Sequence, residues 1–201
     1  LNYLKQIKPT EYVVFVDLDN INNKITKKSI ESCFQKNNWS GCFANQEVGY
    51  YDIFALRANN WNSVDCFAEI YKDNINSFSY IQEDFQMDYL FEKHVLKKMR
   101  KIKKDSEWIE VNSAFGGIGI YKYEDIKNNF YDLTPSKSEY EYECEHVNFN
   151  NRIIENGGKL FINPGFINSK YNEHNKRLKK RFLYLDKLRR FNTLRKDPFN
   201  L

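Results

Sequence analysis

Apolar residues along this chain fall into short continuous runs, separated by stretches in which they recur at helical spacing. The run Tyr12–Val16 is apolar and rich in β-branched residues, which predicts a strand buried on both faces of a sheet. Similar runs predict strands over residues 41–45, 50–57, 108–111, 118–123 and 159–163, the last of them closed by Pro164 and Gly165.

Three other stretches, residues 27–37, 84–103 and 145–156, have the pattern of helices. The middle one surrounds an apolar face with charged residues, and the last one stops at Gly157 and Gly158, as helix C-termini often do. Strands mixed with helices in this way predict an α/β or α+β layered fold, and we expect a mixed sheet flanked by helices.

Composition favours one packed domain followed by a basic tail. Of 201 residues, 41% are hydrophobic and 16% are aromatic, which argues for a globular core. The net charge of +4 is too small to indicate a nucleic-acid partner. Lysine and arginine nevertheless crowd beyond residue 175, around apolar residues at helical spacing. We therefore expect a domain over residues 1–170 and a basic helical tail over residues 171–201.

Three interpretations of the tail remain open. It can be a solvated helix that packs its apolar face on the domain. It can be an amphipathic surface that attracts anionic lipid or a phosphate-rich substrate, which would give peripheral membrane contact. Nucleic-acid binding is the least favoured, because the tail has few aromatic residues beyond Phe182, Tyr184 and Phe191.

The four cysteines indicate an intracellular chain. Cys33, Cys42, Cys66 and Cys144 are scattered, with no CxxC pair, so neither a zinc site nor a disulfide framework is expected. No apolar run is long enough to span a bilayer, and no signal peptide is visible. We expect a cytoplasmic protein with reduced thiols.

Asp17 and Asp19 are the first candidates for chemistry. Both follow the apolar strand, and side chains two residues apart on a strand face the same way. Two neighbouring carboxylates repel each other, and a bound Mg²⁺ or Mn²⁺ would remove that conflict. The alternative is an ordinary turn, since Asp and Asn often follow strands.

Two further strings are candidates with equally plain alternatives. Glu145 and His146 open a helix, where a carboxylate is also favoured by the helix dipole alone. The segment from Ser113 to Gly117 contains Phe115, Gly116 and Gly117, whose small residues would let a ligand approach the backbone. In isolation, a β-turn is the more natural interpretation of this segment.

In order and spacing, these elements resemble the second half of GT-A glycosyltransferases, over roughly residues 11–164. The similarity is closest to a bacterial and large-virus branch with a Tyr-Tyr-Asp-Ile-x-Ala-Leu-Arg strand, here residues 50–57. The resemblance implies a GT-A-like mixed sheet. It also implies a Mn²⁺ or Mg²⁺ ion on the DxD pair, Asp17 and Asp19, and a UDP-, GDP- or dTDP-sugar as donor.

The resemblance also implies roles for other residues. Glu145 would be the general base that deprotonates an acceptor hydroxyl, with inversion at the sugar. His146 replaces the family's second acidic residue and is a candidate metal ligand, acceptor contact or structural residue. Donor or acceptor contacts are expected from the remaining candidates: Asp52, Arg57, Trp61, Phe115, Gly116 and Gly117. The acceptor would be a glycan, lipid or protein.

Such enzymes place a nucleotide-binding strand and helix before the DxD pair. Only sixteen residues precede Asp17, so we expect that a preceding segment is missing from this chain.

Two rival enzyme families share the string from Val14 to Asn20. NYN/PIN-like ribonucleases need further acidic strand ends, for which Asp65, Asp84 and Asp88 are the best available. HAD phosphatases need a later lysine and acidic pair, and neither is well placed here. A non-catalytic module derived from a glycosyltransferase is a third alternative.

Overall fold

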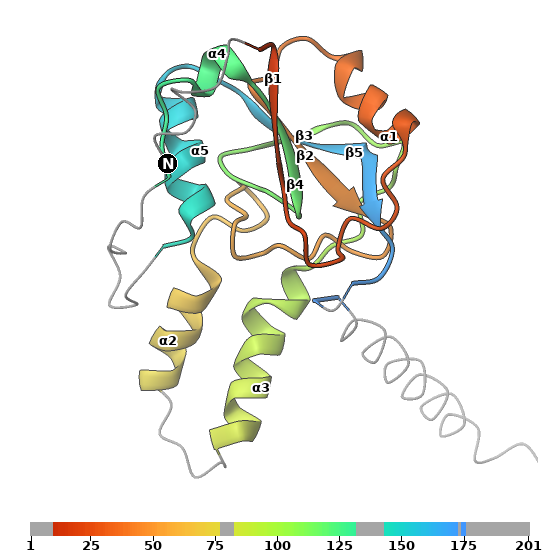
Figure 1. Cartoon of the computed structure of the whole chain (residues 1–201). Coiled ribbons are helices and arrows are strands. Elements are labelled where there is room, and N and C mark those ends of the chain that lie inside the picture. Colours follow the sequence, from red (N-terminus) through yellow and green to blue (C-terminus); the bar gives the residue numbers. More distant parts are fainter. Residues whose placement is uncertain (1–9, 77–82, 132–142, 173, 176–201) are drawn as a thin grey trace, which may run out of the picture.

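A computed structural model describes residues 10–76, 83–131, 143–172 and 174–175 (Figure 1). The first nine residues lie outside this part, as does the basic tail from residue 176. The described part is a mixed α/β structure built on a five-stranded sheet, which confirms the predicted class at that level. Its strand order is β1-β4-β2-β5-β3.

The directions of the strands bring three of their ends to one edge of the sheet. β1 (Tyr12–Val16) and β2 (Gly41–Gln46) both pair antiparallel with β4 (Ile118–Lys122). β5 (Leu160–Ser169) pairs parallel with β2 and antiparallel with β3 (Ile109–Val111). β1, β2 and β5 therefore run in the same direction, and their C-terminal ends lie at the end of the sheet where β4 begins.

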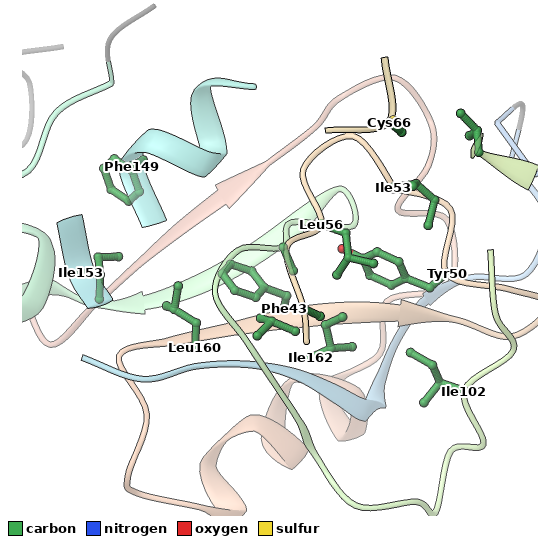
Figure 2. Close-up of a cluster of buried hydrophobic side chains, with 14 of the residues drawn as sticks. Phe43, Tyr50, Ile53, Leu56, Cys66, Ile102, Phe149, Ile153, Leu160 and Ile162 are labelled. Carbon is green, nitrogen blue, oxygen red and sulfur yellow. The ribbon is translucent and has the colours of Figure 1, made fainter. Parts of the chain in front are cut away.

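Alternating side chains give the sheet two packed faces. Phe43 of β2 and Leu160 of β5 lie in one apolar cluster, which includes Phe149 and Ile153 of α5 (Glu145–Glu155) (Figure 2). On the other face, Cys42 packs in a second cluster with residues of the 3₁₀ helix η1 (Ser32–Gln35), which follows α1 (Lys27–Glu31). α1 and α5 lie on opposite sides of the sheet in Figure 1.

The remaining helices belong to the connections. α2 (Cys66–Asn76) and α3 (Glu83–His94) lie side by side below the sheet in Figure 1, and the 3₁₀ helix η2 (Leu96–Lys98) follows α3. α4 (Tyr123–Ile126) is a single turn after β4. The sequence patterns predicted α5 and its end well: Gly157, with φ of 83°, and Gly158 donate to the carbonyls of Ile154 and Ile153.

The expectation that β1 is buried on both faces is wrong. β1 pairs with one strand among the described residues, β4, and therefore lies at an edge of the sheet. Its side chains Val14 and Val16 are 52% and 44% exposed. An apolar run predicts a strand, but it does not distinguish a central strand from an edge strand.

The predicted strand over residues 50–57 is a looped segment instead. The Asp52 side chain accepts a hydrogen bond from the N–H of Ala55 (3.2 Å), and the N–H of Ile53 bonds to the carbonyl of Tyr51 (2.9 Å). These local bonds turn the chain in place of a strand ladder. The segment is apolar because it is buried: Tyr50, Ile53 and Leu56 all lie in the main core (Figure 2).

Three other predicted boundaries are also wrong. The helix expected over residues 84–103 ends at His94, because the chain then leaves the helix to bury Leu96 and Ile102. The helix expected over residues 27–37 divides into α1 and η1. The last strand continues past Pro164 to Ser169 through an irregularity in its pairing with β2, which accommodates the proline. The sequence patterns did not predict α2.

Candidate active site

Carboxylates from three separate segments surround Asp17, at the edge where β1, β2 and β5 end. The neighbouring charges are those of Asp19, of Asp52 from the loop after β2, and of Glu145 at the start of α5. Burial and these three carboxylates raise the pKa of Asp17 from 3.8 to about 6. Partial burial is the largest cause, and only His174 acts in the opposite direction.

A chain of amide side chains fixes the backbone around Asp17. Asn22 donates from its Nδ2 atom to the carbonyls of Asp17 (2.8 Å) and Gly117 (2.9 Å). Its Oδ1 atom accepts from Asn168 of β5 (2.8 Å), and Asn168 in turn accepts from Gln46 of β2 (2.9 Å). Gln46 and Asn168 are fully buried. These side chains tie together the ends of β1, β2 and β5.

The turn at Gly116 and Gly117 is held by the protein itself. The residues have φ of 69° and 86°, which side-chain-bearing residues rarely adopt. A β-carbon on Gly117 would collide with Ile21 and lie 2.9 Å from the Tyr51 hydroxyl. Small residues are needed here for close packing within the protein, which is a different reason from the ligand approach that the sequence suggested.

Asp52 connects this turn to the carboxylate cluster. Its Oδ2 atom accepts from the N–H of Gly116 (2.9 Å), and its Oδ1 atom accepts from Ala55. Both oxygens therefore hold main chain in place while the charge contributes to the raised pKa of Asp17. Asp52, expected as a donor or acceptor contact, lies at the carboxylate cluster.

Glu145 and His146 open α5 beside the cluster. The Glu145 side chain is 48% exposed, and its Oε1 atom lies 3.9 Å from Nε2 of His146. The His146 ring stacks on Phe115 (3.9 Å between centroids), and its Nδ1 atom hydrogen bonds with the Tyr131 hydroxyl (3.1 Å). Burial lowers the pKa of His146, against the opposing effect of Asp52 and Glu145, and so favours the neutral ring. Phe115 therefore positions His146, and Nε2 is the ring nitrogen on the Glu145 side.

His174, which no sequence pattern indicated, also reaches the cluster. Its Nε2 atom lies 3.8 Å from Oδ2 of Asp19, and its ring stacks on Tyr51 (5.1 Å between centroids). His174 follows the end of β5 in an asparagine-rich string that matches no metal or catalytic motif. Only the tertiary structure brings it to Asp19.

Two expected site residues have structural contacts elsewhere. Arg57 is buried and forms ion pairs with Asp65 (2.7 Å) and Glu143 (3.4 Å). Trp61 packs edge-on against Tyr50 and donates its indole N–H to the Lys98 carbonyl (2.7 Å). Trp61 thus packs against the main core.

The carboxylate oxygens of this site suit a hard divalent cation that takes its other ligands from water and from a bound substrate. Within the part of the chain that the structure describes, no three His, Cys, Asp or Glu side chains are close enough together to hold a metal ion. Mg²⁺ and Mn²⁺ sites often use one or two carboxylates and take their remaining oxygens from water and substrate phosphates. Asp17 and Asp19 fit that pattern, because a cation would relieve the repulsion at Asp17.

Comparisons with known proteins do not assign the chain. No family model matches it, and no curated protein matches its sequence.

No helix within the described residues combines the length and the apolar character needed to cross a bilayer. The four cysteines are free and buried.

Proposed function

We propose that this chain is the metal-binding and acceptor-side part of a glycosyltransferase that moves a sugar from a nucleotide-sugar to a hydroxyl group. The observation that carries the proposal is the convergence of Asp19, Asp52 and Glu145 on Asp17, which together with burial raises the pKa of Asp17. Ordinary turn residues at a strand end do not gather such a cluster. The resemblance to GT-A enzymes supplies the reaction class.

Asp17 and Asp19 would hold Mn²⁺ or Mg²⁺ against the donor diphosphate. The bound metal would neutralise the negative charge that develops on the departing nucleoside diphosphate. Asp17 is fixed for this role by its N–H bond to the Gly117 carbonyl (2.9 Å) and by Asn22. Asp19 is 47% exposed, so it is accessible to a ligand from solvent.

Glu145 would accept the proton of the acceptor hydroxyl as its oxygen attacks the anomeric carbon. The side chain is half exposed and stands at the start of a helix whose first turn it shares with His146. Positioned general bases contribute roughly 10²–10⁴-fold to rate. Attack from the face opposite the leaving diphosphate would invert the anomeric configuration.

A thermal-shift series tests the donor side of this proposal. We would measure the unfolding midpoint with Mn²⁺ alone and with UDP, GDP, dTDP or CMP. A ligand present at 100 times its dissociation constant stabilises the folded state by about 2.7 kcal/mol, equivalent to roughly 5–10 °C here. We expect one nucleotide to raise the midpoint only with Mn²⁺, and Asp17→Asn/Asp19→Asn to abolish the rise. Asp105→Asn, an exposed aspartate elsewhere, is the matched control.

A second variant tests the base. Glu145→Gln should keep the nucleotide-dependent shift and lose transfer by about 10²-fold or more. Glu155→Gln, at the other end of α5, should leave both unchanged. A shift that persists in the double aspartate variant, or cleavage of single-stranded RNA that requires Asp17, would contradict the transferase proposal.

A further inference from the structure

A groove of about 1300 Å³ lies on the α1 side of the molecule. It is lined by the residues around the start of α1, by the last part of β5, and by the segment that follows η2. None of the four carboxylates of the candidate active site lines it. The groove is therefore a separate feature, with its own chemistry.

The lining of this groove is strongly basic. Glu47 is the only acidic residue among the described residues that line it, and it pairs with one lysine, Lys24 (2.9 Å). All of the groove lysines are exposed: Lys24, Lys28, Lys101, Lys103, Lys104 and Lys170. Six cations against one carboxylate, in a concave surface, concentrate positive potential.

One wall of the groove is fastened to the sheet. The Ile102 side chain is buried in the main core, and its carbonyl accepts from Asn45 Nδ2 (3.3 Å). Two residues earlier, the carbonyl of Arg100 accepts from the N–H of Tyr50 (2.8 Å). With Ile102 turned inward, the flanking Lys101 and the following lysines are presented to solvent from a fixed backbone.

The opposite wall is fixed in the same way. The N–H of Lys24 bonds to the Asn168 carbonyl (2.8 Å), which ties this wall to β5. Thr26 caps α1, with reciprocal bonds between Thr26 and Ser29. Residues Gly165 and Ile167 of β5 also line the groove. The lysines therefore line a preformed groove between two anchored segments.

The shape and lining of the groove restrict its ligand. Its volume exceeds the roughly 300–1,000 Å³ of small-molecule pockets, which favours an extended ligand. Single-stranded nucleic acids usually stack bases on several aromatic rings, and Tyr171 is the only aromatic side chain among the described lining residues. A concave surface also fits a flat bilayer poorly.

We propose that this groove binds an extended acidic glycan, a polysaccharide that carries carboxylate, sulfate or phosphate groups. In a glycosyltransferase such a chain would be the acceptor; that role rests on the proposed function, whereas binding in the groove does not.

Fluorescence anisotropy with a labelled heparin octasaccharide tests the binding. The full chain is titrated in buffer with EDTA and without nucleotide, so neither the metal nor the donor contributes. Lys101→Gln/Lys103→Gln/Lys104→Gln should weaken binding by roughly 100-fold and reduce the dependence of affinity on salt. The matched control, Lys27→Gln/Lys97→Gln/Lys127→Gln, removes the same charge from exposed sites outside the groove and should change affinity by less than about threefold.

Further arms identify the ligand class. A second groove variant, Lys24→Gln/Lys28→Gln/Lys170→Gln from the other walls, should show the same loss as the first. Equal losses in the control and groove variants would overturn the proposal, because binding would then follow total charge. Tighter binding of oligo(dT) of matched charge, or of phosphatidylserine vesicles, would also overturn it, as would no octasaccharide binding at all.

The two proposals can fail separately. A nucleotide shift without octasaccharide binding would leave the transferase proposal standing and refute the groove. Octasaccharide binding through the groove lysines, without any metal-dependent nucleotide shift, would leave the groove as an acidic-glycan site in a protein that is not a transferase.

Discussion

Two groups of acidic side chains in this molecule have opposite electrostatic settings. Asp65 and Glu143 face the buried guanidinium of Arg57, which compensates their charge. Asp17 faces three other carboxylates, and the pKa of its carboxyl rises to about 6. A compensated group stabilises the fold, whereas an uncompensated one costs stability and is kept for another purpose. The first group therefore has a structural setting, and the second is the one that the proposed function uses.

The largest expected effect comes from the compensated group. Arg57→Met leaves the Asp65 and Glu143 carboxylates without their buried partner, and breaking a buried ion pair on one side costs about 3–5 kcal/mol. For a chain of this size we expect the unfolding midpoint to fall by roughly 6–20 °C. Thermal unfolding followed by circular dichroism measures this. An unchanged midpoint would show that Arg57 is not structural.

Replacing Asp by Asn should have opposite effects on the stability of the fold in the two groups. Asp65→Asn removes the charge that pairs with Arg57 and weakens the bonds that Asp65 accepts from the N–H groups of Phe67 and Ala68 at the start of α2. We expect a loss of about 1–3 kcal/mol, measured by urea unfolding. Stabilisation by this change would remove the contrast between the two groups.

Asp17→Asn should instead stabilise the metal-free protein, by a smaller amount. The folded-state pKa of about 6 lies above the unfolded value, so ionisation of Asp17 destabilises the fold increasingly as pH rises through this range. We expect the variant's midpoint to exceed that of the wild type at pH 7, and the difference to shrink towards pH 4, where the folded carboxyl is protonated and the unfolded one is partly protonated. Asp105→Asn should show no such pH dependence. A gain that is equal at both pH values would refute the raised pKa.

The sequence could predict part of this site for a physical reason. Asp17 and Asp19 follow an apolar strand, and Glu145 opens an amphipathic helix, so local patterns place both near element ends. The positions that the patterns missed depend on distant partners. The resemblance implied that Arg57 contacts the ligand, whereas its observed partners, Asp65 and Glu143, are brought to it by the fold.

The fold likewise divides into elements that local sequence patterns predict and features that depend on distant contacts. The apolar pattern predicted most strands and the end of α5, because those elements follow from local sequence. It predicted a strand over residues 50–57, since a largely buried loop is as apolar as a strand, and it did not reveal that β1 is an edge strand. His174 reaches Asp19 through the course of the chain after β5, for which the sequence carries no local signal.

The most direct test of the central claim is a Mn²⁺ titration followed by electron paramagnetic resonance, with and without a nucleoside diphosphate. We predict about one Mn²⁺ per chain at pH 7.5, in line with a site of one or two carboxylates completed by phosphate oxygens. Affinity should fall below pH 6, where Asp17 takes up a proton. Binding should be lost in Asp17→Asn and in Asp19→Asn and kept in Asp105→Asn. Mn²⁺ binding that is the same in Asp17→Asn as in the wild type, or absent from the wild type under both conditions, would contradict the account.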